Sequence, residues 1–249
     1  MKILLTVPSK DRVETLKKFT FPWLSLIKHH WAIFVEPQDF AKYKAEFPWE
    51  HIVVMDSDNQ GLGYAKDYIQ KFAEENGYDL IFKIDDDIKC FTDFRHSLSP
   101  EETAVMIDGF LDKQAIPLFE NKDLLGAIAF PYSFEMYEPV EWNKTKRVQT
   151  AYICRTKYVA QPIKGISVFE DFAVGLQIMV AGDVILKYGM IGINMGVKVG
   201  GGTGGHQSFN RAEKALLEVP LLRKIYPPLK FKKVQKEWQI EPDLRSVKL

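Results

Sequence analysis

Hydrophobic positions in the first 95 residues form short apolar runs, and longer stretches with helical spacing lie between them. Apolar runs rich in β-branched and aromatic residues predict buried strands. They cover residues 2–7, 32–35, 51–55 and a run that opens at residue 80. Stretches with apolar residues three or four apart predict helices, and they cover residues 13–25, 37–47 and 64–76. This alternation predicts a parallel sheet with helices on both faces.

The second half of the chain is less regular. Ser-Pro-Glu-Glu at residues 99–102 has the spacing of a capping box with proline at the first helical position, so a helix is expected to start there. Another helix is expected over residues 172–181, ended by Gly182. Strands are expected at residues 126–132 and 150–155, and a loop or sheet edge at residues 135–147.

These elements predict one α/β domain, because 249 residues suffice for a single large core and no repeat or linker interrupts the chain. The 33 basic and 33 acidic residues balance, which excludes an overall basic field for nucleic acid. Cys90 and Cys154 fit neither a zinc spacing nor a disulfide framework, so a reducing cytoplasm is expected. Secretion and membrane insertion are not expected, because an apolar leader and a long apolar run are both absent.

Three consecutive aspartates, Asp85, Asp86 and Asp87, follow the run that opens at residue 80. Adjacent carboxylates beside a core repel each other unless a cation neutralises them. A hard divalent ion, with water and a substrate phosphate in its shell, suits such ligands. In open α/β sheets ligands lie outside the carboxyl ends of the strands, where these aspartates are expected. The alternative is a solvated acidic turn.

A glycine-containing turn precedes the helix expected at residues 64–76. Gly61 and Gly63 allow a ligand to approach the backbone closely, and the following helix N-terminus favours negative charge. Asn59 belongs to the same turn. The third glycine of a dinucleotide fingerprint is absent, so a dehydrogenase finds little support. Lys66, one turn into the helix, is within reach of a diphosphate; the alternative is an ordinary surface lysine.

Four segments follow one another in the chain: Pro-Ser-Lys-Asp-Arg at residues 8–12, Gly-Leu-Gly-Tyr-Ala-Lys at 61–66, Ile-Asp-Asp-Asp-Ile at 84–88 and Glu-Asp at 170–171. In order and spacing they resemble the nucleotide-sugar-dependent glycosyltransferases of the GT-A fold, whose signature is the DxD motif. The compact length and a glycine-rich segment ending at His206 are most similar to phage enzymes related to the TET-associated glycosyltransferases. Those enzymes attach sugars to hydroxymethylated pyrimidines in DNA.

The resemblance implies a GT-A, Rossmann-like domain with a mostly parallel sheet over residues 1–210. Its nucleotide-sugar half would cover residues 1–95 and its acceptor half residues 96–210. The remaining residues, 211–249, carry 10 basic and 5 acidic side chains and are expected to pack on the same domain.

The resemblance also implies site residues. Asp85 and Asp87 would hold Mn²⁺ or Mg²⁺ on the donor diphosphate, with Asp86 in reach of a sugar hydroxyl. Asp171, beside Glu170, falls where inverting members carry the general base. In a retaining enzyme Asp171 would orient the sugar or the acceptor instead, and a third interpretation is that both acidic residues only favour the helix dipole. The remaining donor contacts would come from Thr6, Pro8, Ser9, Arg12, Asn59, Gly61, Gly63 and Lys66.

The segment Gly-Gly-Gly-Thr-Gly-Gly-His at residues 200–206 contains too much glycine for a strand interior. One interpretation is a loop that orders over bound donor, with His206 completing the shell of Mn²⁺. The other is a plain surface loop. Lys66-Asp67 stands where an Arg-Asn pair is common in the family, which leaves the roles of both residues open.

The sequence therefore predicts a cytoplasmic, metal-dependent glycosyltransferase that moves a sugar, glucose in the first instance, from a UDP-sugar to a hydroxyl group. The first acceptor to consider is 5-hydroxymethylpyrimidine in phage DNA, and residues 142–147 and 229–238 are candidate DNA contacts. The second of these segments also fits an amphipathic closing segment with a solvated basic side. Alternatives are a protein or glycan acceptor, a metal-dependent nucleotidyltransferase, and a catalytically silent module that binds nucleotide sugar.

Overall fold

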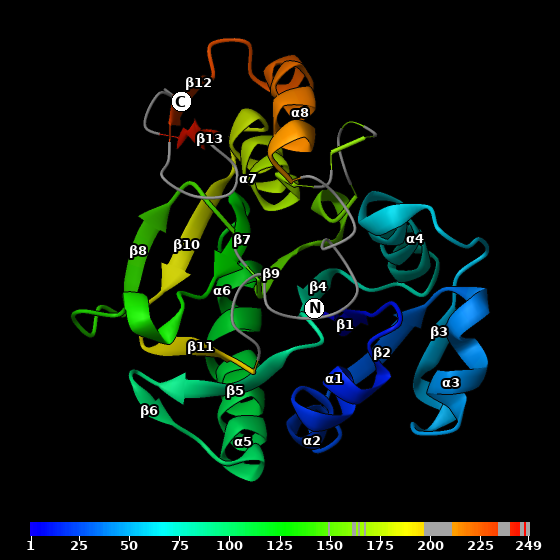
Figure 1. Cartoon of the computed structure of the whole chain (residues 1–249). Coiled ribbons are helices and arrows are strands. Elements are labelled where there is room, and N and C mark those ends of the chain that lie inside the picture. Colours follow the sequence, from blue (N-terminus) through cyan, green and yellow to red (C-terminus); the bar gives the residue numbers. More distant parts are fainter. Residues whose placement is uncertain are drawn as a thin grey trace.

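The structure is a computed structural model that describes residues 1–148, 150–160, 163, 165–166, 168–196, 211–233, 240–244 and 247. Its centre is an eight-stranded sheet with the strand order β3-β2-β1-β4-β9-β7-β10-β8 (Figure 1). The strands of this sheet are β1 (Ile3–Pro8), β2 (His30–Val35), β3 (Ile52–Val54), β4 (Leu80–Lys83), β7 (Leu125–Ala129), β8 (Trp142–Thr145), β9 (Tyr152–Arg155) and β10 (Val184–Tyr188).

Most strands of this sheet run in one direction. The pairs β3/β2, β2/β1, β1/β4 and β7/β10 are parallel, whereas β9 is antiparallel to both β4 and β7. Edge strand β8 is antiparallel to β10, which confirms the expected sheet edge in this region. The prediction of a mostly parallel α/β sheet is therefore confirmed, while the insertion of a reversed strand between β4 and β7 was not foreseen.

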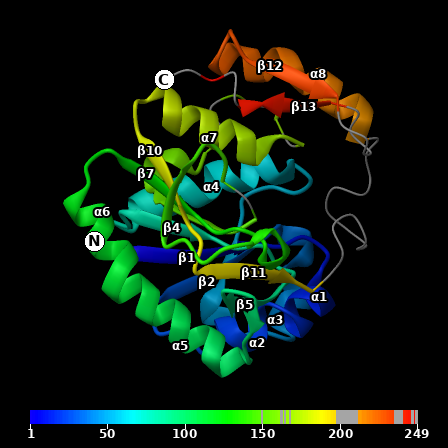
Figure 2. The ribbon, with the colours of Figure 1, turned by 90° about the vertical axis from the view of Figure 1, so that its left-hand side faces the viewer.

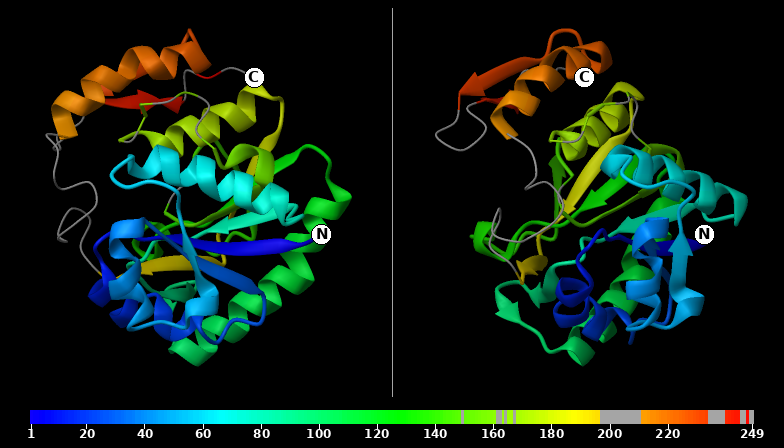
Figure 3. Two further views of the ribbon diagram at one scale, coloured as in Figure 1. Left: turned by 90° about the vertical axis from the view of Figure 1, so that its right-hand side faces the viewer. Right: turned by 45° about the vertical axis from the view of Figure 1, so that its right-hand side comes forward.

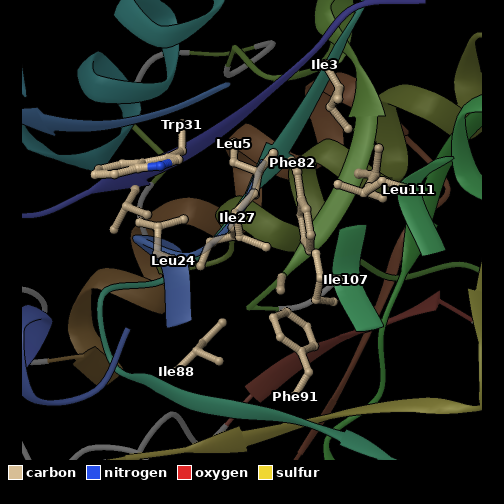
Figure 4. Close-up of a cluster of buried hydrophobic side chains, with 14 of the residues drawn as sticks. Ile3, Leu5, Leu24, Ile27, Trp31, Phe82, Ile88, Phe91, Ile107 and Leu111 are labelled. Carbon is tan, nitrogen blue, oxygen red and sulfur yellow. The ribbon is translucent and has the colours of Figure 1, made fainter. Parts of the chain in front are cut away.

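Helices cover both faces of the sheet (Figure 2). Side chains alternate along β1, so Ile3, Leu5 and Val7 enter one hydrophobic cluster and Leu4 enters the other. The first cluster packs against α5, where Phe82 lies beside Ile107 (Figure 4). Its helices are α1 (Val13–Lys18), α2 (Phe21–Leu24), α3 (Phe40–Lys44), α5 (Pro100–Phe110) and α6 (Ile116–Asn121), with a π-helical turn, Leu111–Ala115, between the last two.

The opposite face carries α4 (Gly61–Glu75), α7 (Glu170–Val180) and α8 (Arg211–Ile225) (Figure 3). Phe169 and Phe172 at the start of α7 share a buried cluster with Ala215 and Leu222 of α8. A hairpin of β12 (Lys230–Lys233) and β13 (Ile240–Asp243) follows α8. Within the described part of the chain, each helix is too short or too polar to span a bilayer.

A second sheet, with the order β11-β5-β6, is built from β5 (Ile88–Asp93), β6 (His96–Ser97) and β11 (Ile191–Met195). The apolar run from residue 80 is therefore interrupted: β4 ends at Lys83 and β5 begins at Ile88. The three aspartates form the turn between two strands of different sheets. The hydrophobic pattern does not predict β5 as a separate strand, because its first residue, Ile88, is apolar and reads as the end of the apolar stretch that opens at residue 80.

One expected helix is divided. Residues 13–25 form α1 and α2 rather than one helix, with the break before Pro22, whose ring removes a backbone donor. At this break the Thr20 hydroxyl donates to the carbonyl of Asp85 at 3.0 Å and accepts from the amide of Ile88 at 3.0 Å. The break thus holds both ends of the aspartate turn.

Helix ends otherwise follow local sequence. The capping box of Ser99 and Glu102 is present, and the left-handed φ of +67° at Gly77 and +82° at Gly182 ends α4 and α7 as expected. The exceptions are two helices that begin early: α7 begins at Glu170 instead of residue 172, and α4 begins at Gly61 instead of residue 64. The first turn of α4 therefore includes the two glycines that were expected in the preceding loop.

Candidate active site

The aspartate turn lies at the carboxyl ends of two neighbouring parallel strands, β1 and β4. Arg12, in the loop after β1, reaches across to it. Its guanidinium contacts Asp86 Oδ1 at 2.6 Å through Nη1 and Asp87 Oδ2 at 2.9 Å through Nη2. One cation thereby neutralises part of the repulsion within the turn.

Asp86 points into the interior. Its side chain is buried and accepts a hydrogen bond of 2.6 Å from the Ser9 hydroxyl, which also contacts the Tyr43 hydroxyl at 2.7 Å. Burial raises the pKa of Asp86 to about 7, against the opposing effect of Arg12. Burial and the neighbouring Asp85 charge likewise raise the pKa of Asp87. The structure gives Asp86 the role of holding the turn, and its contact with the donor stays a prediction.

Asp85 is the more open carboxylate, with about one third of its side chain accessible, and it is paired with Lys83. Lys83 is buried, donates to the carbonyl of Thr150 at 3.1 Å and stands on the face of β4 that carries α4 and α7. Burial alone would lower the pKa of this amine, but the Asp85 charge raises it above its ordinary value. Lys83 is therefore a permanent cation beneath the aspartate turn.

The start of α7 carries the other acidic pair. Asp171 Oδ1 lies 3.7 Å and Glu170 Oε1 lies 4.0 Å from the Nζ atom of Lys66, which extends from α4. Burial, followed by the Glu170 charge, raises the pKa of Asp171 to about 7. Asp171 lies beside Lys66 and Asp85 beside Lys83, and the Nζ atoms of both lysines lie 5.9 Å from the centre of the Tyr152 ring, so the start of α7 and the aspartate turn are close neighbours. A carboxylate with a pKa near neutrality has the property expected of a general base.

The loop before α7 is fixed from α8. The buried carboxylate of Glu218 accepts bonds of 3.0 Å from the amide of Val168, to both oxygens, and from the amide of Phe169. Phe169 is the N-cap residue of α7 and lacks a capping side chain of its own. Glu218 therefore satisfies backbone donors at the helix end that presents Asp171.

Replacing Glu218 by alanine is expected to lower both stability and turnover. Two buried amides lose their acceptor, which costs about 1–3 kcal/mol in the free energy of unfolding, and the α7 start loses its fixed position. A thermal melt should show Tm lower by roughly 2–4 °C per kcal/mol, and kcat should fall with it. Glu213→Ala on the same helix is the control, and equal effects of the two substitutions would contradict this role for Glu218.

The aspartate turn fits a divalent ion in part. The bonds within the described residues use Oδ1 of Asp85 and Oδ2 of Asp87, which leaves one carboxylate oxygen of each for a cation. Magnesium is commonly held by one or two carboxylates together with water and substrate phosphates. A cluster of three or more His, Cys, Asp or Glu side chains suited to a metal is absent from the described residues. From the described residues, the turn thus offers a cation two carboxylate oxygens and no further side-chain ligand.

The structure places the other predicted donor contacts around the same sheet edge. Thr6 is buried on β1 beside Lys83 in register, and Pro8 ends that strand. Asn59, with φ of +57°, accepts from Lys10 Nζ at 2.8 Å, which ties the loop after β3 to the loop after β1. Gly61 and Gly63 lie in the first turn of α4. His206 and the glycine-rich segment lie outside the described residues, as do residues 234–239 of the basic segment.

Sequence reasoning missed four residues of the site. Lys83 was visible as a lysine at the end of an apolar run, and Glu218 as an acidic residue among leucines, although neither signal indicates a partner. Thr20 and Tyr152 have no local signal at all. Tyr152 is buried on β9, directly beside Lys83 in register.

The order of these parts, from the β1 loop through the aspartate turn to the α7 start, has a counterpart among known proteins. A family model described as TET-Associated Glycosyltransferase matches residues 3–199. The chain belongs to this family. The match includes the aspartate turn and the start of α7 of this TET-associated glycosyltransferase, and it ends before α8. The glycosyltransferase prediction is thereby confirmed at the level of the family. None of the curated proteins compared with the chain matches it.

Solved structures support the fold. Glucosyl-3-phosphoglycerate synthase from Mycobacterium tuberculosis, in complex with Mg²⁺ and uridine diphosphate, is similar with a TM-score of 0.52 at 9% identity, over 97% of this chain and 86% of that one. S. aureus TarS 1-349 is similar with a TM-score of 0.50 at 12% identity, over 78% of this chain. The match spans 59% of the TarS chain. At these identities the likeness shows the fold, and the GT-A prediction is confirmed.

Proposed function

We propose that this TET-associated glycosyltransferase is metal-dependent and transfers a sugar, glucose in the first instance, from a UDP-sugar to a hydroxyl group. The observation that carries the proposal is the meeting of two acidic elements at one sheet edge. Asp85 and Asp87 offer oxygens for a cation, and Asp171 offers a carboxylate with a pKa near neutrality. Glycosyl transfer from a diphosphate donor requires stabilisation of the negative charge on the leaving group and removal of the proton from the acceptor hydroxyl.

The donor assignment draws on the neighbours as well. The synthase from Mycobacterium tuberculosis was solved with uridine diphosphate and either Mg²⁺ or Mn²⁺. In the present chain, Ser9 and Arg12 of the loop after β1 contact the aspartate turn, and Lys10 of the same loop contacts Asn59 of the loop after β3. We propose that these two loops bind the nucleoside diphosphate. A bound divalent ion would add positive charge where the diphosphate leaves.

The residues of the chain then have separate tasks. Asp85 and Asp87 would hold the cation, while Arg12 and Lys83 keep their carboxylates in place. Asp171 would accept the proton of the acceptor hydroxyl as that oxygen attacks the sugar, and the diphosphate would depart from the same carbon. This division corresponds to the inverting outcome.

For the acceptor we propose the hydroxymethyl group of a modified pyrimidine in DNA. Membership of the TET-associated family supports this acceptor. The described part of the basic segment also carries two exposed lysines, Lys230 and Lys232, a residue type that contacts phosphates. Because the net charge of the whole chain is zero, such contacts would come from a local basic segment and not from an overall positive field.

Incubation with hydroxymethylated DNA, a panel of sugar nucleotides and Mn²⁺ tests the proposal. Release of UDP together with a hexose on the modified nucleoside, detected by mass spectrometry, is the expected result. Pyrophosphate release would indicate nucleotidyl transfer instead. Metal-dependent binding of UDP-sugar without any product would indicate a silent binding module, and sugar transfer only to protein or glycan would replace DNA as the acceptor.

A further inference from the structure

Three buried side chains form a connected unit between the two acidic elements of the site, and we call Lys66, Tyr152 and Lys83 the lysine–tyrosine–lysine core. The Nζ atoms of Lys66 and Lys83 both lie 5.9 Å from the centre of the Tyr152 ring. All three side chains are buried, and they come from α4, β9 and β4. The core therefore spans the interior beneath the site.

Each end of the core contacts one acidic element. Lys83 pairs with Asp85 in the aspartate turn. Lys66 lies 3.7 Å from Asp171 and 4.0 Å from Glu170 at the start of α7. Lys66 and Lys83 thus lie at the same distance from one ring, and each lies beside one acidic element.

Lys66 is unusual among the described residues because its Nζ atom is buried and has no hydrogen-bond acceptor. An ammonium removed from water in this way is costly unless anions lie close by. The Oδ1 atom of Asp171 also lacks a donor. The two groups are close enough for charge attraction and too far apart for a hydrogen bond.

We propose that Lys66 is a positioning residue for Asp171, and that the lysine–tyrosine–lysine core sets the place of the α7 carboxylate relative to the aspartate turn. The inference rests on the proposed role of Asp171 as the base. It gives Lys66 a task different from the diphosphate contact that its place in the sequence suggests.

The charges around Asp171 make the effect of Lys66 measurable. Lys66 and Lys83 lower the pKa of Asp171, whereas burial, Glu170 and Asp85 raise it. Without Lys66, a single ammonium faces three carboxylates, so the Asp171 proton is retained to higher pH. Among the described residues, the titratable groups that interact electrostatically with Asp171 are Glu170 on α7, Lys66 on α4, Lys83 and Asp85 at the end of β4, Tyr152 on β9 and Tyr132 after β7.

Lys66→Met, which keeps the apolar stem and removes the charge, is the decisive variant. The pH profile of kcat is expected to move to higher pH by about 1–3 units, the size produced by losing an opposite charge within roughly 4–6 Å. Affinity for UDP with Mn²⁺, measured by calorimetry, should stay within about two-fold. Lys66→Arg, which restores the charge, should return the profile to its original position.

The control is Lys71→Met, an exposed lysine of the same helix that pairs with Glu75, and its profile should match that of the unaltered protein. An unshifted profile for Lys66→Met, or UDP binding weakened more than about ten-fold, would overturn the inference. The second result would return Lys66 to the donor site.

An NMR titration of the Asp171 carboxyl separates this inference from the proposed function. The same alkaline shift should be visible there without any turnover. If Asp171→Asn kept normal turnover, the base assignment would fail, yet the titration would still show whether Lys66 controls this carboxyl. A titration unaffected by Lys66→Met would reject the positioning role itself.

Discussion

Asp171→Asn is expected to lower kcat by about 10²–10⁴-fold, the usual contribution of a positioned general base. The asparagine side chain has nearly the same shape but cannot accept a proton at neutral pH. Because Asp171 lies on α7 and the donor loops follow β1 and β3, affinity for UDP and Mn²⁺ should be unaffected. Steady-state turnover together with calorimetric titration of UDP measures both quantities.

A matched control is Glu101→Gln, which also removes an acidic side chain from the first turn of a helix, α5, away from the site. It should leave kcat unchanged. Near-normal turnover of Asp171→Asn would remove this residue as the base, and the retaining interpretation, in which Asp171 only orients a substrate, would gain support.

The same substitution has a second expected effect, on the pH dependence of stability. Burial raises the pKa of Asp171 in the folded protein from an ordinary value of 3.8 to about 7, so the folded state holds this proton more tightly than the unfolded chain does. Its contribution to stability is present at low pH and is lost as the pH rises through about 7. Asp171→Asn should therefore lose less stability than the unaltered protein between pH 6 and pH 8.5. Equal changes in Tm for both proteins would contradict a raised pKa of Asp171 in the folded protein.

The second large effect is expected from Asp87→Ala. The free oxygen of Asp87 is one of the two carboxylate oxygens that the aspartate turn offers a cation. Loss of a residue that only supports a metal ligand typically weakens metal affinity by about 10–100-fold. Loss of the ligand Asp87 itself should weaken Mn²⁺-dependent UDP binding by at least as much. Calorimetry with and without Mn²⁺ gives the metal-dependent part of the affinity.

Two variants make this result specific. Asp93→Ala removes an exposed carboxylate at the end of β5 and should have no effect on UDP binding. Asp86→Asn keeps an acceptor for the Ser9 hydroxyl and should preserve metal-dependent binding if Asp86 acts by holding the turn. Affinity unchanged in Asp87→Ala would count against a metal site at the turn.

The position of the aspartate turn could be predicted from the sequence, because both features that determine it are local in the chain. An apolar run marks a buried strand, and polar residues that follow it at the carboxyl edge of a parallel sheet lie where ligands bind. The helix expected over residues 172–181 placed Glu170 and Asp171 at a helix start, which the structure confirms. What these carboxylates contact could not be obtained in that way. Arg12 is 75 residues away from Asp87 in the chain.

By itself, the sequence determined the α/β class and the alternating strands and helices from β1 to β4, because side-chain periodicity records the apolar face of each element. Only the tertiary structure decided that β9 runs in reverse between β4 and β7, which places Tyr152 beside Lys83. It also decided that Glu218 caps α7 and that Lys66 faces Asp171. These contacts depend on how distant segments pair, and a burial pattern contains no information about the partner.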